Sequence, residues 1–333
     1  MDKSINSEKN KLVDDFKSSH HKTTNDTTKH VFATKSLNNQ SKFPRDEIEA
    51  KVKNFFEANK NFQILVSVAK LMEAGAHIGL PRYMWNPKML PFIYKSKRLS
   101  KTIIDILKII VFLSRAYNFL YDIAENGGKI LFVGTHNANV KGYVKDEATR
   151  VGAFYVNQRW LGGTLTNYRN VSNSINKLNN LNSLLNSDSI NNYTKKQRLD
   201  ISRKVAKMEK FIGGIKEING LPNAIIVADP ILEHNAVKEA RDLHIPVIAI
   251  ANTNANPNLI DFIIPANTYS IKTQWLILSI LADAIASANG KEMKIVGKKD
   301  GEIILPETTK TPRKIVYTKG TSIDTFVNKK DKK

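Results

Sequence analysis

Cysteine is absent from the 333 residues of the sequence. Disulfide bonds, thiolate metal sites and cysteine nucleophiles are therefore excluded. Secreted proteins held together by disulfides are excluded as well, and a reducing compartment is permitted.

Long apolar runs are also absent, since no stretch approaches the roughly 20 uninterrupted apolar residues that span a bilayer. The first residues, MDKSINSEKNKLVDDF, lack the apolar core of a secretory signal and contain four acidic side chains, and no arginine precedes Arg45. This composition argues against a secretory leader and against an imported presequence. We therefore expect a soluble or peripheral protein.

The motifs that cradle nucleotide phosphates are missing or incomplete. A strand-like run ends in VGTHNANV, which resembles the start of a dinucleotide site, but only Gly134 of the required glycines is present. The loop GxxxxGK(S/T) does not occur. The sequence therefore gives little support to NAD binding or nucleotide hydrolysis, and we expect no cofactor.

Residues suited to metal or hydrolytic chemistry do not converge in the sequence. No histidine has another histidine three or four residues away, as metal pairs on a helix do. The best enzyme-like group is Glu233 and His234, which follow Asp229 at the end of a predicted strand, where open α/β sheets place ligands. Helix capping by Asp229, with the other two on the surface, explains the same residues without chemistry. An α/β enzyme that binds a nucleotide or sugar phosphate near Gly134 and Asp229 stays open as the alternative function.

The charge of the chain is strongly one-sided, with 51 Lys and Arg against 31 Asp and Glu and a net charge of +20. Such a charge repels itself unless a polyanion neutralises it, so nucleic acid is the natural partner. An anionic membrane surface is the rival, but no amphipathic helix with a strongly cationic face stands out.

Five short apolar runs alternate with helix-length stretches from Lys129 onward. This rhythm predicts βαβ units and an α/β fold, with a parallel sheet that has helices on both faces. A closing helix is expected over residues 270–288. The predicted strands are KILFVGT, AFYVNQ, NAIIVAD (223–229), IPVIAIANT (245–253) and FIIPAN (262–267).

An insertion with helical spacing separates the second and third of these strands. Apolar residues recur every three or four positions on each side of a polar turn, which predicts an antiparallel helical hairpin with a coiled-coil seam. Residues 168–216 contain ten Lys and Arg against three Asp and Glu, so the hairpin is basic. A basic arm suits reaching across a polyanion, although an ordinary solvated helix face is the better explanation of the charges when the hairpin is considered alone.

These patterns divide the chain into four parts. We expect a mobile polar extension over 1–44, since it has few apolar groups to bury, and a basic C-terminal tail over 290–333. Between them lie the α/β domain (45–167 and 217–289) and the inserted hairpin (168–216), and the domain is expected to begin with a helix from Asp46 to Ala74.

Two segments interleave aromatic, cationic and small residues in a way that suits RNA, because planar groups stack on unpaired bases and cations neutralise phosphates. In residues 73–98 the expected RNA contacts are Arg82, Tyr83, Trp85, Asn86, Lys88, Lys95, Lys97 and Arg98. In residues 154–167 they are Asn157, Gln158, Arg159, Trp160, Gly162, Gly163 and Asn167. Core packing is an equally good explanation of Trp85 and Trp160, because a tryptophan can serve either purpose.

The same segments carry a resemblance to a known family. WNPKM at 85–89, the preceding EAGAHIG, and VNQRWLGGTLTN at 156–167 resemble the signature stretches of the bacterial-type ribosomal protein S-two family. Residues 213–267 and LADAI at 281–285 resemble it as well, so the resemblance runs in order from Phe62 to Ala288. The sequence departs from the family at Leu80, where a second histidine is common.

The resemblance implies a flavodoxin-like or Rossmann-like α/β domain with an inserted helical hairpin. It implies a structural constituent of the small ribosomal subunit that binds small-subunit rRNA and neighbouring ribosomal proteins between head and body. No catalysis, cofactor, metal, membrane or small-molecule substrate is implied. Both terminal extensions and an AT-rich composition favour an organelle-encoded mitochondrial member in the matrix, with a plastid or a low-GC bacterium as the alternative.

Overall fold

The computed structural model describes residues 65–94, 101–187 and 192–307. The predicted extension over 1–44 lies outside these residues, and of the helix expected from Asp46 only the end is described, as α3 (Val68–Ala74). Three candidate RNA contacts also lie outside the described residues: Lys95, Lys97 and Arg98.

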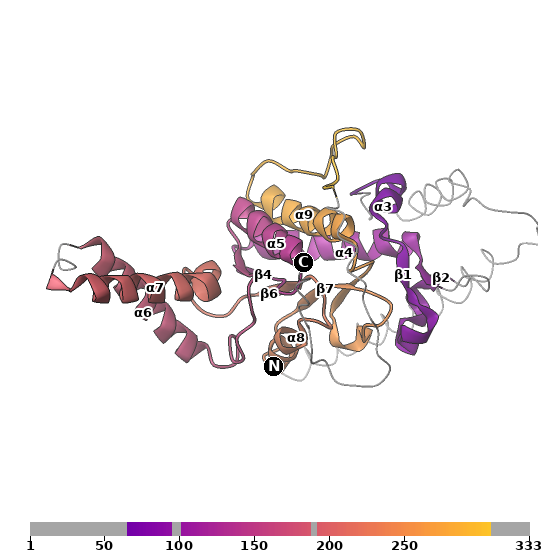
Figure 1. The fold of residues 1–333 in the computed structure, drawn as a ribbon. Helices are drawn as coiled ribbons and strands as arrows, with labels where there is room; N and C mark the ends of the chain where they lie inside the picture. Colours follow the sequence, from indigo (N-terminus) through magenta and orange to yellow (C-terminus); the bar gives the residue numbers. More distant parts are fainter. Residues whose placement is uncertain (1–64, 95–100, 188–191, 308–333) are drawn as a thin grey trace, which may run out of the picture. The chain divides into compact units, whose positions relative to one another are not determined.

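A five-stranded parallel sheet forms the centre of the described chain (Figure 1). Every residue of its three middle strands is buried, because helices cover both faces, and this explains why their sequences are continuous apolar runs. In chain order the strands are β4 (Ile130–Val133), β5 (Phe154–Val156), β6 (Ala224–Val227), β7 (Val247–Ala251) and β8 (Phe262–Pro265).

The order of the strands across the sheet is β5-β4-β6-β7-β8, and all neighbours are parallel. Numbered along the chain this is 2-1-3-4-5, the flavodoxin-like order, so the predicted fold is confirmed. The winding direction reverses between β4 and β6. The carboxyl ends of these two strands are where such sheets place ligands.

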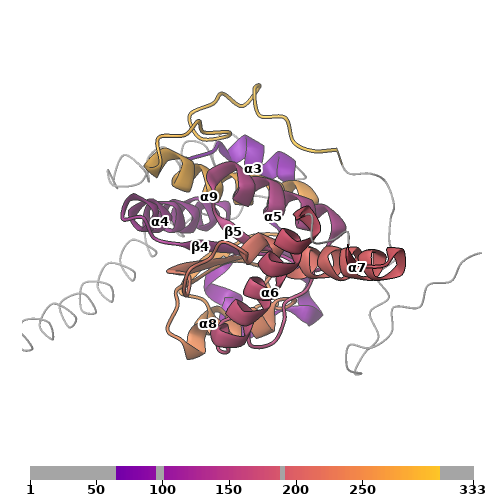
Figure 2. The ribbon, with the colours of Figure 1, turned by 90° about the vertical axis from the view of Figure 1, so that its left-hand side faces the viewer.

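Helices pack on both faces of the sheet (Figures 1 and 2). One face is covered by α4, α5 and α9, and the other by α8 together with the base of the hairpin. Side chains alternate along each strand, so Leu131 and Val133 join the core on the α8 side. The bounds are α4 (Ile106–Glu125), α5 (Ala138–Val151), α8 (His234–Asp242) and α9 (Ile271–Ala288).

Helix α9 is the most apolar helix of the domain and matches the predicted closing helix. It is long and apolar enough to cross a membrane by length and composition, but 72% of it is buried inside the protein. It packs against α4 and α5, which is the expected environment of a core helix in a three-layer α/β domain.

The inserted hairpin consists of α6 (Tyr168–Asn186) and α7 (Lys195–Ile212), which pack against each other. Thr194 and Gln197 form a reciprocal capping box that fixes the start of α7. Only the base of the apolar seam is fully buried, at Ile175, Leu178 and Ile212, where the hairpin meets the sheet. The hairpin is therefore anchored in the core at one end.

The sequence patterns do not predict the structure of one region. Residues 78–104 contain β1 (Ile78–Pro81), β2 (Ile93–Tyr94) and β3 (Lys101–Ile104), which form a separate antiparallel sheet in the order β1-β3-β2. Asp105 then caps α4 by accepting the Leu107 N–H at 3.1 Å. The strands are too short and too irregular for periodicity to reveal them.

The first part of the expected C-terminal tail packs on the domain. Residues 290–307 bury Ile295, Val296, Ile303 and Leu305, so the packed chain continues beyond the predicted boundary at 289. Residues 308–333 lie outside the described part of the chain.

Asp283 of α9 holds this segment in place. Its carboxylate is fully buried and accepts the backbone N–H groups of Lys294, Ile295 and Val296 at 2.8, 2.6 and 2.9 Å. The Arg150 guanidinium lies 2.8 Å from it and also pairs with the buried Glu147. Four donors thus satisfy one buried charge, as burial of a carboxylate requires.

Asp283→Asn should therefore loosen residues 290–307. We expect the free energy of unfolding to fall by about 2–4 kcal/mol, because Arg150 and buried N–H groups lose a charged acceptor. Urea denaturation measures this change, and limited proteolysis should cut residues 290–307 sooner. Asp122→Asn, an exposed site on α4, is the control. Equal stability of Asp283→Asn and the parent protein would contradict the role given to this carboxylate.

Candidate nucleic-acid interface

The first candidate segment is held against the carboxyl end of β7 by backbone contacts. The Asn86 N–H donates to the Thr253 carbonyl at 2.8 Å, and the Leu80 N–H donates to Thr253 Oγ1 at 3.1 Å. Gly79 is required there, since a Cβ at this position would lie only 2.7 Å from Thr253 Cγ2. Residues 82–92 of the segment are therefore fixed, although their regular structure is limited to two short 3₁₀ helices, η1 (Arg82–Met84) and η2 (Pro87–Phe92).

Within this segment the cationic and aromatic side chains face outward. Arg82 and Lys88 are exposed, and the Tyr83 ring is 75% exposed. Trp85 is half-buried, and the Asn86 side chain caps η2 by accepting the Lys88 N–H at 3.0 Å. An exposed ring between two cations is the arrangement that stacks on a base and neutralises phosphates.

The second candidate segment leaves β5 and leads into the hairpin. Arg159, Gly162 and Asn167 are exposed, whereas Asn157 and Gln158 are half-buried. The Asn157 side-chain amide donates to the Lys141 carbonyl at 3.0 Å. A Cβ on Gly162 would meet no atom within 4 Å, so the backbone is open to a ligand there.

Gly163 has a φ of +84°, a conformation that L-residues rarely adopt. This left-handed turn brings the loop back toward α8 before α6 begins. The glycine is therefore needed for the path of the chain, which leaves Gly162 as the glycine that exposes backbone.

Trp160 lies in the core and is only 8% exposed. Its indole N–H donates to Glu239 Oε1 at 2.9 Å. Of the two explanations given for this residue, core packing describes it, and its ring is not placed to stack on a base.

Glu239 supports the second segment, and the sequence analysis missed it. Oε1 accepts from Trp160 and from the Gly163 N–H at 2.8 Å, and Oε2 accepts the Leu165 and Thr166 N–H groups at 2.9 and 3.3 Å. Burial raises the pKa of this carboxyl, but the hydrogen bonds outweigh burial, so its pKa lies below the ordinary value. The available signal was a glutamate in the apolar stripe of α8, beside Ala236 and Ala240.

A cationic stripe on α7 was also missed. Lys196, Arg203, Lys207 and Lys210 are spaced by seven, four and three residues, which places them on one face of the helix, opposite the apolar seam. All four are exposed, and among the described residues the only ion pair of the stripe joins Arg203 to Asp200 at 3.9 Å. The stripe spans 14 residues, about 21 Å. The corresponding face of α6 begins with the exposed Arg169 and continues with four uncharged residues, Asn173, Asn176, Asn180 and Ser183.

The enzyme-like group at the switch point is occupied by structural contacts. Asp229 Oδ1 accepts the Ile231 N–H at 2.9 Å, and Glu233 Oε1 accepts the Thr135 N–H at 2.5 Å and lies 3.0 Å from His136 Nδ1. Burial raises the pKa of Asp229. Asp229 therefore caps the turn that precedes α8 and not the helix itself. The expectation that Glu233 lies on the surface is wrong, because Glu233 is buried and its carboxylate bonds the backbone at the end of β4, whereas His234 is exposed as expected.

Gly134 has a packing role at the same edge. A Cβ there would lie 2.9 Å from Val144 Cγ2 and 3.1 Å from Ala228 Cβ. The glycine therefore lets α5 approach the sheet closely, which explains it without a pyrophosphate. Among residues 65–94, 101–187 and 192–307, no three His, Asp or Glu side chains are grouped as a metal site would need.

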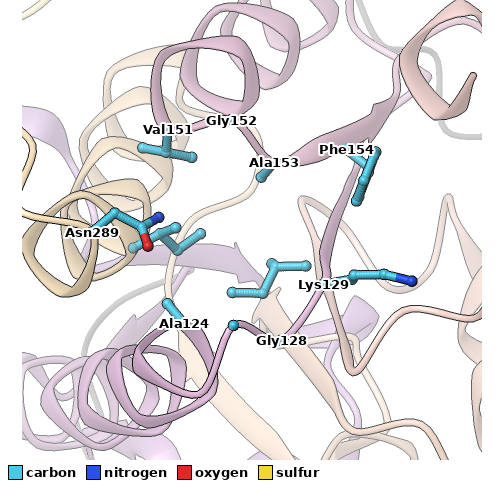
Figure 3. A pocket seen from close by; sticks show the side chains of 11 residues that line it. Ala124, Gly128, Lys129, Val151, Gly152, Ala153, Phe154 and Asn289 are labelled. Carbon is cyan, nitrogen blue, oxygen red and sulfur yellow. The ribbon is translucent and has the colours of Figure 1, made fainter. Parts of the chain in front are cut away.

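A cavity of about 210 Å³ lies at the opposite, amino-terminal edge of the sheet (Figure 3). It is lined by the last turns of α4, α5 and α9 and by the starts of β4 and β5. Its walls are mostly glycine and apolar side chains, with Lys129 and Asn289 as the polar groups. The cavity therefore lies away from the candidate RNA contacts, although Phe154 at the start of the second segment lines it. Its one ionisable lining group, the Lys129 ammonium, donates to the Asn219 carbonyl.

Comparison with known proteins decides the family. The family Ribosomal protein S2 matches residues 71–288. The chain belongs to the ribosomal protein S2 family. It is 53% identical to small ribosomal subunit protein uS2 of Ureaplasma urealyticum over 82% of this chain and 78% of that protein. It is 47% identical to uS2 of Malacoplasma penetrans over 75% and 70%, and 42% identical to uS2 of Mycoplasmoides gallisepticum over 79% and 82%.

The predicted membership of the S2 family is thereby confirmed, with matched residues close to the range Phe62 to Ala288 expected from the sequence. Leu80, the departure noted above, is buried in the contact with Thr253. A side chain at this position therefore packs inward, so the departure alters packing beneath the first segment and not its exposed surface.

The contact between His136 and Glu233 predicts that the free energy of unfolding depends on pH. The hydrogen bond to Glu233 raises the pKa of His136 above 6.5. Because the folded protein holds this proton more tightly than the unfolded chain, the stabilisation is fully present below pH 6.5 and is lost as the pH rises through the raised pKa. Proton NMR titration should report the raised value, and Glu233→Gln should lower it. Glu217→Gln, an exposed site elsewhere, is the control, and an unchanged titration in Glu233→Gln would contradict this assignment.

Proposed function

We infer that the chain is a structural constituent of the small ribosomal subunit and is not an enzyme. The observation that carries this inference is the family match over residues 71–288, together with small-subunit relatives that are 42–53% identical. The enzyme alternative finds no support, because Gly134 has a packing role and the carboxylates of Asp229 and Glu233 bond backbone N–H groups.

We propose that the protein binds small-subunit rRNA through three exposed surfaces. Two are the candidate segments, represented by Arg82, Tyr83, Trp85, Asn86 and Lys88 and by Asn157, Gln158, Arg159, Gly162, Gly163 and Asn167. The third is the α7 stripe, which meets the requirement of a phosphate-binding surface because its cations are aligned and exposed. Lys95, Lys97 and Arg98 extend the first surface as sequence-based candidates.

The remaining partners follow from this role. We propose that the protein lies between the head and the body of the subunit and contacts neighbouring ribosomal proteins there, with the extension over 1–44 and the residues from 308 onward as candidate contact segments. The relatives come from bacteria, so the mitochondrial residence favoured by composition gains no support from them. A bacterial ribosome is the location that we propose.

Neutralising the α7 stripe should weaken rRNA binding and make the affinity less dependent on salt concentration. In the variant Lys196→Gln, Arg203→Gln, Lys207→Gln, Lys210→Gln, the slope of log K against log salt should become shallower by about 0.7–0.9 for each phosphate that the variant no longer neutralises. Filter binding of the full chain to small-subunit rRNA at several salt concentrations measures the slope. Alanine substitutions at Asn173, Asn176, Asn180 and Ser183 on α6 are the matched control. An unchanged slope in the α7 variant would remove the stripe from the interface.

Charge reversal at Lys88 and Arg159 tests the other two surfaces. Both side chains are exposed, so Lys88→Glu and Arg159→Glu should leave the thermal unfolding temperature unchanged. Because each variant places a negative charge against phosphate, tagged protein should cosediment less with small subunits on a sucrose gradient. Lys238→Glu on the exposed side of α8 is the control. Normal cosedimentation of the double variant would exclude these two residues as contacts.

A further inference from the structure

We propose that Glu239, assisted by Tyr168, is a positioning residue that holds the hairpin and its preceding loop in the direction required for rRNA binding. This inference rests on the proposed function. Neither side chain is a contact in the proposal; each acts through the segments that it holds.

The Glu239 carboxylate is the fixed point of the loop that enters the hairpin. Residues 160–166 contribute five donors to its two oxygens, including the Thr166 hydroxyl at 3.3 Å. The loop has no regular secondary structure, so these bonds replace the hydrogen-bond ladder that a helix or strand would provide. Because Glu239 belongs to α8, which packs against the sheet, the loop is tied to the rigid domain.

Tyr168 joins the entering and returning legs at the base of the hairpin. Its hydroxyl donates to the Ile218 carbonyl at 2.7 Å and accepts the Gly220 N–H at 2.8 Å. Tyr168 is the first residue of α6, only two residues beyond the loop that Glu239 holds. The returning leg is fixed a second time by Gly214, where a Cβ would lie 2.6 Å from Tyr155 Cδ2 of β5.

These contacts have a consequence for the α7 stripe. The stripe lies along α7, and buried apolar contacts at the base are few, at Ile175, Leu178, Ile212 and Ile215. A small rotation at the base displaces the far end of α7, which begins about 27 Å away at Lys195. The orientation of the hairpin at its base therefore decides whether the α7 stripe and the loop that contains Arg159 can contact one RNA surface together.

Glu239→Gln keeps the size of the side chain but leaves one acceptor oxygen. At least two of the N–H donors then face an amide NH₂ group, so the loop should take up several orientations. If the binding-competent orientation falls to about a tenth of the population, the apparent affinity for rRNA falls about tenfold. Tyr168→Phe removes the bridge between the legs and should act in the same direction with a smaller effect.

The absence of cysteine allows the orientation to be measured directly. Nitroxide labels at Ser183→Cys on α6 and Lys145→Cys on α5, both exposed sites, report the distance between hairpin and domain by double electron–electron resonance. We expect a narrow distance distribution in the parent protein and a broad one in Glu239→Gln. Asp242→Asn, an exposed carboxylate on the same helix, is the control and should leave the distribution narrow.

The same variants are compared for rRNA binding at a fixed salt concentration, below their unfolding temperatures. A broad distribution with about tenfold weaker binding supports the positioning role. A narrow distribution in Glu239→Gln, or a broad one with unchanged affinity, overturns it, while binding by the parent protein leaves the proposed function standing. Failure of the parent protein to bind rRNA would instead overturn the proposed function.

Discussion

The buried carboxylate of Glu239 is the interaction on which the path of the loop into the hairpin depends. A buried carboxylate loses its hydration, so hydrogen-bond donors must replace the lost water. Here all the donors come from one irregular loop. The loop depends on the carboxylate in turn, because the loop keeps its path only while this acceptor is present. Asp283 does the same for the segment that follows α9. In both places a buried acid on a helix orders a stretch of chain that has no hydrogen-bond ladder of its own.

The positive charge of the chain is distributed unevenly over the surfaces that the fold provides. Lys and Arg near the α/β core are partly engaged, as Arg150 is with Glu147 and Asp283. The cations of α7 point away from the apolar seam and have few acidic neighbours. In the described part of the chain, the hairpin gives this positive charge a direction, because it places a row of cations opposite its own packing surface.

At the carboxyl edge of the sheet, side chains occupy the position where α/β folds of this kind usually bind a ligand. At the switch point between β4 and β6, the space beside Gly134 is filled by side chains of α5 and by Ala228, and Glu233 bonds the backbone of Thr135. The candidate segments meet the same edge at β5 and β7 but use it as support. The edge therefore presents exposed side chains such as Arg82 and Arg159 outward.

The sequence by itself determined the strands, the closing helix, the hairpin and the family, because continuous apolar runs and helical spacing are local properties. It also located the two candidate RNA segments, because cations such as Arg82 and Arg159 stand close to aromatic residues, glycine and proline in the sequence. Only the tertiary structure decided that Trp160 belongs to the core and that residues 290–307 pack on the domain. Both outcomes depend on a carboxylate outside the local pattern, Glu239 for the first and Asp283 for the second. Which donors reach a buried acid is set by how the layers pack, and no local pattern contains that information.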